Sequence, residues 1–540
     1  MRVAGAILML IGLLAGGAAG ILQAGYVQPG DWVVGRSQVV NPNHERVVVS
    51  SYGSTSYDSG LRITTTGADG QAVFIGTANP IDVDDYTADV ARVEITKLAL
   101  FQRVETSGLA GSKDLPAEPV GLDFWIDHKY GQGAQSLVVD TSGAPAQVMV
   151  VAPAGQPISV RVDHVVAGVR TILLGVIGVG AGLVLIGLTL LVVGIVRRNR
   201  RQPPDPASTP TAPMPMTPPP ALPTSTLARC VAGLLAVSVV LATTGCTVPR
   251  TPKPVDVIPR ADVTKVPLPS ESISRVTADL ETRMGTARTT SSPPGYSTEA
   301  WPTVYTGVAL VSRTFGTTLA KATGDTTNRD ACGLVIADLY GDHQRTYPMT
   351  TTALLRWGCR PEVEAYYTVL TRAHSYDHWL IAAEVRAGSE STPPKGSTDV
   401  VTADEKTLAE TVVSAMDGRT TTGLSSTVAN VVNAISAAMN PLADKADMSM
   451  SLAPPDPATY PTALIASKTQ SGMLVTFSLF VTVTMNAKPG YYLYWNPPLD
   501  QLLNQPGHRQ SLTRRYLSTV AVAFDGDVPT ILGQTETPIG

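Results

Sequence analysis

The chain is poor in charged residues. Only 16% of its 540 residues are Asp, Glu, Lys or Arg, whereas soluble domains have about 25%. Long apolar segments and spacers rich in Ala, Gly, Thr and Pro explain this deficit better than an unusual core does. The formal net charge is -4, and no patch of Lys and Arg with interleaved aromatics occurs. The composition therefore argues against nucleic acid as a partner.

The chain also lacks the short motifs by which many enzyme families are recognised. It contains no Gly-x-Ser-x-Gly elbow, no Ser-x-x-Lys, no P-loop, no Gly-x-Gly-x-x-Gly and no His-Glu-x-x-His sequence. Its carboxylates are scattered, and no pair has a spacing that implies acid and base roles. The sequence therefore predicts no catalytic residue and no cofactor.

Histidine is scarce, with 7 residues, and one group of them suggests a metal site. His374 and His378 flank Asp377, a spacing that places both imidazoles on one face of a helix or strand and suits zinc. A third ligand is needed, and Asp342 with His343 is the candidate. The alternative, which we favour, is an exposed turn that carries the same residues and binds no metal.

Cysteine is scarcer still, with 4 residues. Cys332 and Cys359 follow the last long apolar stretch, and outside the cell they would meet an oxidising environment. There they can form a disulfide, which contributes ~3 kcal/mol by restricting the unfolded chain. The alternative is two unrelated buried thiols.

What the chain does have is three long apolar stretches, at residues 3–22, 171–196 and 230–244. The first, within residues 1–25, predicts either a signal anchor or a signal peptide that is removed, because small residues follow its apolar run. In both cases the chain that follows is exported.

The second stretch predicts a transmembrane helix over residues 169–196. Its apolar part is uncharged and longer than the roughly 20 residues that cross the hydrocarbon. Four arginines follow it: Arg197, Arg198, Arg200 and Arg201. Because positive charge is retained in the cytoplasm, the helix runs from outside to inside, and residues 26–168 lie outside.

The third stretch, within residues 229–245, returns the chain to the outside and ends in Thr243-Thr244-Gly245-Cys246. This ending is similar to a lipoprotein processing site, although Thr243 stands where such sites have Leu. Two alternatives stay open: Cys246 is lipidated after cleavage, or the stretch is an uncleaved third span. Residues 246–270 then form a Pro-rich tether.

The segment between the second and third stretches, residues 197–228, is basic at its start and then rich in Pro. Such a segment cannot bury a core, and it predicts an extended cytoplasmic linker. The alternative is a recognition segment for a partner inside the cell.

Residues 26–168 predict an extracytoplasmic β-rich domain with one helix at residues 81–93. Asp82, Asp84 and Asp85 at the helix start are predicted to cap free N–H groups, since the spacing of a calcium loop is absent. Runs of β-branched and alternating residues between turn signals predict strands at 46–50, 61–66, 72–76, 136–140, 147–151 and 158–162.

The motifs Ala72-Val-Phe-Ile-Gly76, Phe124-Trp125 and Gln147-Val-Met-Val-Val151 occur here in an order that resembles a family of actinobacterial membrane proteins. The resemblance covers roughly the first 200 residues. It implies a β-sandwich-like exterior domain that precedes the membrane helix. No activity is assigned to that family, so it adds no chemistry.

Residues 271–540 predict an α+β region in two halves, 271–400 and 401–540. The expected helices are 271–287, 403–416 and 426–439. The expected strands are 304–310, 333–339, 350–357, 363–371, 378–385, 463–468, 473–485, 491–494 and 518–524.

This region resembles a C-terminal domain found in actinobacterial lipoproteins and membrane proteins. The resemblance rests on Tyr305-Thr-Gly-Val-Ala-Leu310, Tyr347-Pro348 and Asp377-His378-Trp379. It implies two halves similar to the NTF2-like fold, in which a curved sheet wraps helices around a pocket. Because that fold serves enzymes and binding modules alike, it selects no function.

The sequence thus favours a multi-pass cell-envelope membrane protein with both large domains outside, acting as non-catalytic modules for an envelope ligand or protein. One alternative is an extracytoplasmic enzyme that uses a pocket in the C-terminal region. Another is a membrane sensor or assembly factor that uses the Pro-rich linker.

Overall fold

The structure, a computed structural model, describes most of the chain. The described residues are 2–52, 60–97, 105–139, 145–166, 168–199, 263–325, 333–358, 365–388, 392–416, 429, 433, 446–494, 498–504, 506–525 and 528–539. Helices make up 32% and strands 39%, so the fold is mixed, as the α+β prediction requires. The chain divides into two compact units.

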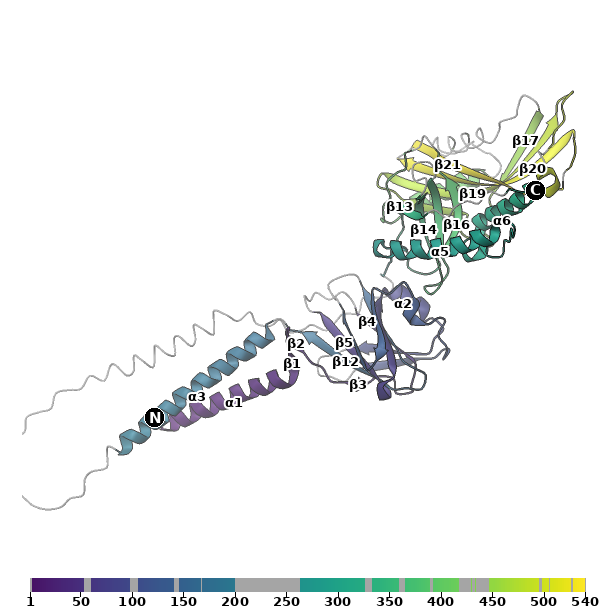
Figure 1. Ribbon diagram of the computed structural model, residues 1–540. Helices are drawn as coiled ribbons and strands as arrows, with labels where there is room; N and C mark the ends of the chain where they lie inside the picture. Colours follow the sequence, from purple (N-terminus) through teal and green to yellow (C-terminus); the bar gives the residue numbers. More distant parts are fainter. Residues whose placement is uncertain are drawn as a thin grey trace, which may run out of the picture. The chain divides into compact units, whose positions relative to one another are not determined.

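The first unit comprises Met1–Thr77, Ala91–Lys113 and Asp127–Ile258. Its two long helices, α1 (Arg2–Tyr26) and α3 (Val169–Asn199), lie side by side (Figure 1). They are antiparallel, because the N-terminal part of α1 contacts the C-terminal part of α3. Uninterrupted apolar sequence without Pro explains why both stretches form long helices.

Glycines hold these two helices close together. A Cβ atom built at Gly12 would lie 2.5 Å from the carbonyl oxygen of Gly180, and one built at Gly5 would lie 2.7 Å from that of Gly187. On each helix the two glycines are about two turns apart, so they share one face. We call this contact the glycine seam. Small residues allow such close approach of backbones in helix pairs.

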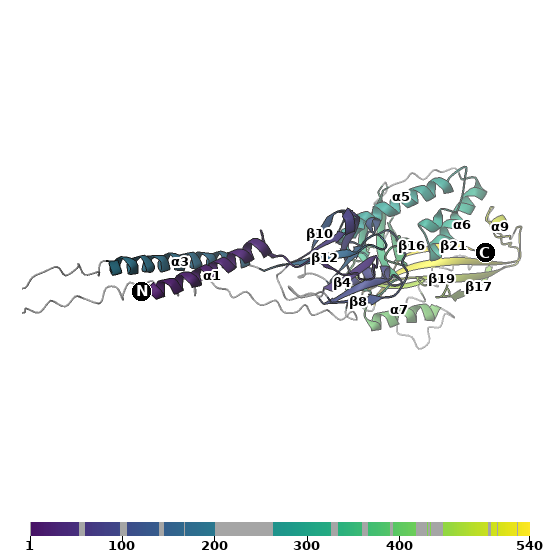
Figure 2. The ribbon, with the colours of Figure 1, turned by 90° about the horizontal axis from the view of Figure 1, so that it is seen from below.

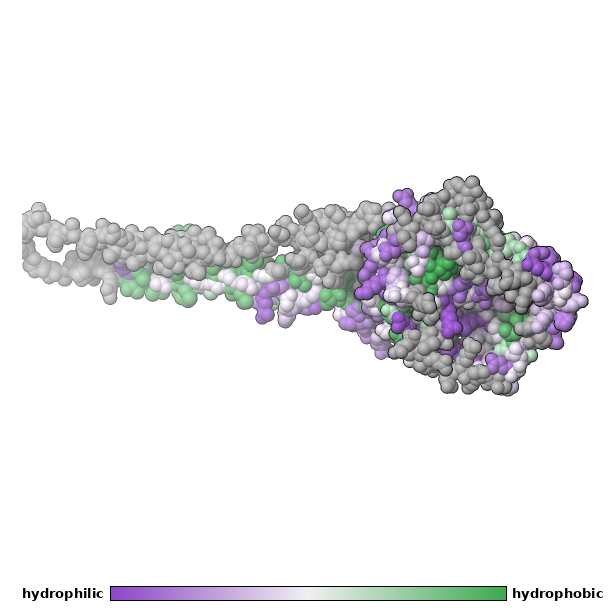
Figure 3. Space-filling view, turned by 90° about the horizontal axis from the view of Figure 1, so that it is seen from above, coloured by the Kyte–Doolittle hydropathy of each residue, from purple (hydrophilic) through white to green (hydrophobic). Residues whose placement is uncertain are grey.

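Many large apolar side chains of both helices are exposed, whereas glycines of the seam are buried. Leu14 is 65% exposed and Leu185 is 64% exposed, whereas Gly5 and Gly12 are buried. Figure 3 shows hydrophobic surface along the helices where grey atoms do not cover them. In the described part of the chain these are the two helices long and apolar enough to cross a membrane.

Two sheets complete the first unit. One contains β1 (Val27–Gln28), β2 (Trp32–Val33), β12 (Ile158–Val165), β5 (Leu61–Gly67) and β10 (Ala134–Val139) in this order, with β3 (Gln38–Val39) on β12. The other has the order β8 (Glu105–Leu109), β7 (Arg92–Lys97), β4 (Val47–Tyr52), β11 (Ala146–Val151), β6 (Ala72–Ala78) and β9 (Asp127–Gln132). Both sheets contribute to one core, Ile63 and Val160 from the first and Val48, Val73 and Val148 from the second.

The second unit comprises Ala78–Val90, Asp114–Ile126 and Pro259–Gly540. Among its described residues it has the α-helices α2 (Pro80–Tyr86), α5 (Ile273–Ser291), α6 (Gly307–Thr323), α7 (Ala403–Met416) and the short α9 (Leu499–Leu502). A four-stranded sheet has the order β13 (Leu334–Tyr340), β14 (Met349–Trp357), β15 (Ala365–Arg372) and β16 (Leu380–Arg386). A five-stranded sheet has the order β17 (Ala446–Ala453), β19 (Gly472–Ala487), β20 (Ser511–Asp525) and β21 (Val528–Pro538), with β18 (Leu464–Lys468) on β19.

Side chains that alternate along β19 point to opposite faces of the five-stranded sheet, and each face packs against a different part of the unit. Val475 and Phe477 share a core with Val412 of α7. On the opposite face Leu474 packs with Tyr367 of the four-stranded sheet. Helices α5 and α6 contact β13 and β16 of the latter sheet, and Figure 2 shows them on the side away from α7. The two predicted halves, 271–400 and 401–540, therefore each supply one sheet to a single unit.

Several predicted elements are wrong or differ in extent. The predicted strand at 304–310 is wrong, because α6 begins at Gly307 and buries Val308 and Ala309. The predicted helix at 81–93 ends at Tyr86, and strand β7 begins at Arg92. A short apolar run is compatible with a helix or with a strand, and tertiary contacts decide which of the two forms.

Some predictions fall on residues that the structure does not describe. These are the apolar stretch at 230–244, the Pro-rich linker beyond Asn199, nearly all of the predicted helix at 426–439, and the cysteines Cys230, Cys246, Cys332 and Cys359.

We expect Gly12→Leu to separate α1 from α3, because its side chain would meet the backbone of Gly180. Such overpacking costs about 1–3 kcal/mol, so the melting temperature of the first unit in detergent should fall. Gly17→Leu is the matched control, since no atom lies within 4 Å of a Cβ at Gly17. Equal melting temperatures for the two variants would contradict the glycine seam.

Candidate functional site

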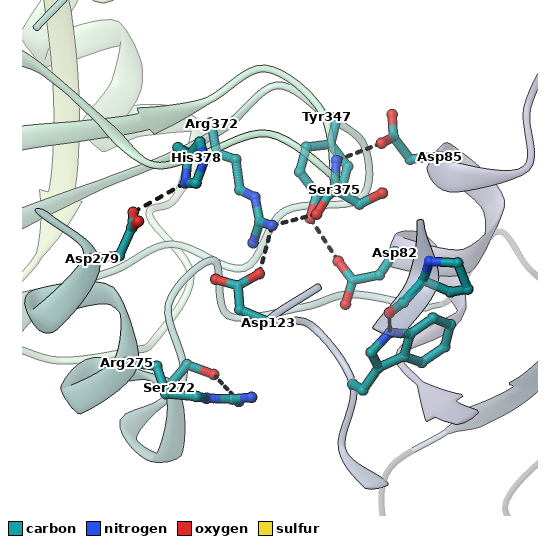
Figure 4. A network of polar contacts seen from close by, with 12 residues as sticks. Asp82, Asp85, Asp123, Ser272, Arg275, Asp279, Tyr347, Arg372, Ser375 and His378 are labelled. Atoms are coloured by element: carbon teal, nitrogen blue, oxygen red, sulfur yellow. Dashed lines mark hydrogen bonds and ion pairs between the residues drawn. The ribbon is translucent and has the colours of Figure 1, made fainter. Parts of the chain in front are cut away.

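The most notable polar cluster of the second unit joins α2 and residues 114–126 to the part of the unit that follows residue 259 (Figure 4). Its members are three carboxylates and the groups that bind them. We call it the carboxylate network and define it as Asp82, Asp85 and Asp123 with Lys265, Tyr347, Arg372 and Ser375.

Local sequence explains how α2 presents two of the carboxylates. The helix begins after Asn79, whose side chain accepts a hydrogen bond from the backbone N–H of Ile81 at 3.0 Å, and Pro80 stands in the first turn. Residues three apart share one face of a helix, so Asp82 and Asp85 project together.

Asp82 is the most buried carboxylate of the carboxylate network, with only 1% of its surface exposed. The ammonium nitrogen of Lys265 lies 2.6 Å from each of its two oxygens. The hydroxyl of Tyr347 donates a third hydrogen bond at 2.7 Å. Burial, and next to it the Asp82 carboxylate, raise the pKa of Tyr347 well above its ordinary value, so this phenol stays a neutral donor.

The other two carboxylates meet residues 372–375. The guanidinium of Arg372, whose side chain is 5% exposed, donates to Asp123 at 2.6 Å and also to the carbonyl oxygen of Ser375. The backbone N–H of Ser375 donates to Asp85 at 2.6 Å. Charge-assisted hydrogen bonds of this kind are the strong ones, so each segment is held at a defined position.

Aromatic side chains lie beside the carboxylate network. The ring of Tyr86 lies 6.1 Å from that of Phe124 and 6.3 Å, edge to face, from that of Tyr376. The hydroxyl of Tyr86 donates to the carbonyl oxygen of Ala117 at 2.6 Å. Tyr86 therefore links α2 both to residues 114–126 and to the turn that carries Tyr376.

The predicted capping role of these aspartates is corrected by the structure. Asn79 is the capping residue, whereas Asp82 and Asp85 bind groups far away in sequence. A cluster of acids at a helix start is equally consistent with both roles. Buried positions for Pro80, Ile81 and Val83 on the same helix are the sign that α2 packs on a partner surface.

The candidate zinc ligands are not brought together. The Nδ1 atom of His374 lies 3.3 Å from Asp85, and that of His378 lies 3.1 Å from Asp279 of α5. Asp377 donates its backbone N–H to the carbonyl oxygen of His374. Each imidazole thus has its own carboxylate partner.

The proposed third ligands lie elsewhere in the second unit. Asp342 binds the ammonium of Lys406 at 2.9 Å and the backbone N–H of Val401, and His343 contacts Thr264. Among the described residues no group of three His, Cys, Asp or Glu side chains is placed to hold a metal ion.

The carboxylate network holds segments of the chain that are far apart in sequence. Each of its carboxylates is matched by a cation or a hydrogen-bond donor. The hydroxyl of Ser375 is buried without a hydrogen-bond partner in the described part of the chain, so no base is placed to activate it. The arrangement positions chain segments and offers no nucleophile with its base.

The fold and the network together define a mixed helix-and-sheet protein with two helices of membrane-spanning length and a second unit held by buried ion pairs. No protein-family model, no curated protein and no solved structure matches the chain.

We expect Lys265→Met to destabilise the second unit strongly. Removing one partner of a buried pair leaves an uncompensated charge at Asp82, which costs about 3–5 kcal/mol. Urea unfolding followed by tryptophan fluorescence measures this loss.

Lys406→Met is the matched control, because the Lys406 side chain, which pairs with Asp342, is 53% exposed, whereas that of Lys265 is 11% exposed. Such pairs contribute about 0–1 kcal/mol. A loss in Lys265→Met no larger than that in Lys406→Met would show that Asp82 is not held as described.

Proposed function

We propose that the protein is a multi-pass cell-envelope membrane protein whose exterior domains act as non-catalytic binding or interaction modules. The observation that carries this proposal is the antiparallel pair of α1 and α3, with glycines at the contact and large apolar side chains facing outward. This pattern is typical of helices whose surroundings are lipid, where exposed apolar side chains cost nothing.

The positions of the helix ends support the proposal that residues 27–166 lie on one side of the membrane. The chain leaves α1 at Tyr26 and enters α3 at Val169, which lie at the same end of the antiparallel pair. Asp31 connects the chain that follows α1 to the start of α3, since its carboxylate accepts hydrogen bonds from the backbone N–H groups of Gly168 and Arg170. The opposite end carries Arg2 and Arg197, and the positive-inside rule assigns that end to the cytoplasm.

The composition of the second unit supports a further crossing. This unit contains residues 78–90 and 114–126, which precede α3, and also residues from 263 onward, which follow it. Since a compact unit occupies one side of a membrane, we propose that the chain returns between residues 199 and 263. The apolar stretch at 230–244 is the segment whose sequence suits that return.

Both large domains would then lie outside, as modules of the envelope. Each half of the second unit combines helices with an antiparallel sheet. The likeness to NTF2-like halves and to the actinobacterial family stays part of this proposal. A carboxylate network whose carboxylates are all matched supports a role in binding or assembly rather than in catalysis.

Labelling on intact cells tests this topology. We expect a membrane-impermeant maleimide to label Thr106→Cys in the first unit and Glu410→Cys in the second, both of which replace exposed residues. Thr217→Cys in the Pro-rich linker should react only after lysis.

The parent chain with its native cysteines gives the background, and the same variants in lysed cells show that each cysteine can react. Protection of Glu410→Cys on intact cells would reject the proposed placement of the second unit.

A further inference from the structure

The carboxylate network joins segments that are remote in sequence. Asp82 and Asp123 come from residues that precede α3, whereas Lys265 and Arg372 come from residues that follow the third apolar stretch. The hydrogen bonds and ion pairs named here join described residues on both sides of the contact.

The contact also has the composition of a specific protein interface. At its centre the ion pair of Asp82 and Lys265 is almost fully buried, with side-chain exposures of 1% and 11%. The aromatic contact between Tyr86 and Tyr376 lies beside it. Buried charged pairs and aromatic anchors of this kind dominate binding energy in protein complexes.

We propose that segments 78–90 and 114–126 form a docking surface for the C-terminal domain, residues 263–539, which they bind without a covalent connection. The charges of the two sides are complementary. The docking surface supplies the carboxylates Asp82, Asp85 and Asp123, and the C-terminal domain supplies the cations Lys265 and Arg372 and a backbone N–H donor. A chain cut between residues 246 and 263 therefore remains one particle.

This inference goes beyond the proposed function and is independent of membrane orientation. It gives the predicted processing site at Cys246 a specific consequence. Cleavage there would leave two products, one with α1, α3 and the docking surface, the other with the C-terminal domain. The carboxylate network would keep these products paired.

The test cuts the intact protein after it has folded. A site for a sequence-specific protease is inserted in the tether between residues 250 and 262 of the full chain, which carries an affinity tag at its N-terminus. The protein is cleaved in detergent, bound through the tag and washed. We expect the C-terminal fragment to stay on the resin.

Variants then test whether the carboxylate network holds the fragments. Lys265→Met and Arg372→Met should each lower the retained fraction roughly tenfold or more, because each leaves a carboxylate without its cation. Lys406→Met, whose pair lies outside the network, should retain the fragment as the parent does. Full release from the parent, or equal retention in all variants, would overturn the proposal.

Exchanging the charges of Asp82 and Lys265 distinguishes a variant that fails to dock from one that fails to fold. In the double variant Asp82→Lys with Lys265→Asp, the opposite charges face each other again, and retention should recover relative to either single change. Resistance of each uncut variant to trypsin reports folding independently. If the exchanged protein is folded and still releases its C-terminal fragment, the ion pair does not hold the contact.

Discussion

The second unit depends on one buried carboxylate. Asp82 is 1% exposed, and an ionised carboxylate at such a position is tolerated only when cations and donors replace its hydration. Lys265 and Tyr347 supply that replacement. Because these partners follow residue 259 in sequence and Asp82 precedes α3, satisfying one charge fixes the position of α2 within the unit. The remaining contacts, of Asp85 and Asp123, then act in the same direction.

The glycine seam imposes a second constraint, on the first unit. Glycines at the contact bring the backbones of α1 and α3 together and leave many large apolar side chains of the two helices exposed. The length and hydropathy of α1 suit a signal anchor and a removed signal peptide alike, so both alternatives stay predictions. The two constraints act on different units: glycines set the spacing of α1 and α3 in the first unit, and matched charges fix α2 in the second.

Sequence patterns predict the regular elements well and the carboxylate network poorly. The helix at 403–416 has the bounds of α7, and both described apolar stretches are helices. The strand expected at 304–310 is instead the start of α6, since a short apolar run has no decisive period. Asp82 was expected to cap its helix. Its distant partner Lys265 could not be foreseen, because nothing in local sequence encodes a contact between positions so far apart.

Hydrogen–deuterium exchange of the full-length protein tests the central claim most directly. Helix α2 has only 7 residues, and a helix of this length is stable only when it is docked. If the carboxylate network holds it, the amides of residues 78–90 should be protected about as well as those of α7, and they should exchange at least roughly tenfold faster in Asp82→Asn while α7 is unchanged. Exchange of residues 78–90 at the rate of an unstructured peptide in the parent protein would contradict the account.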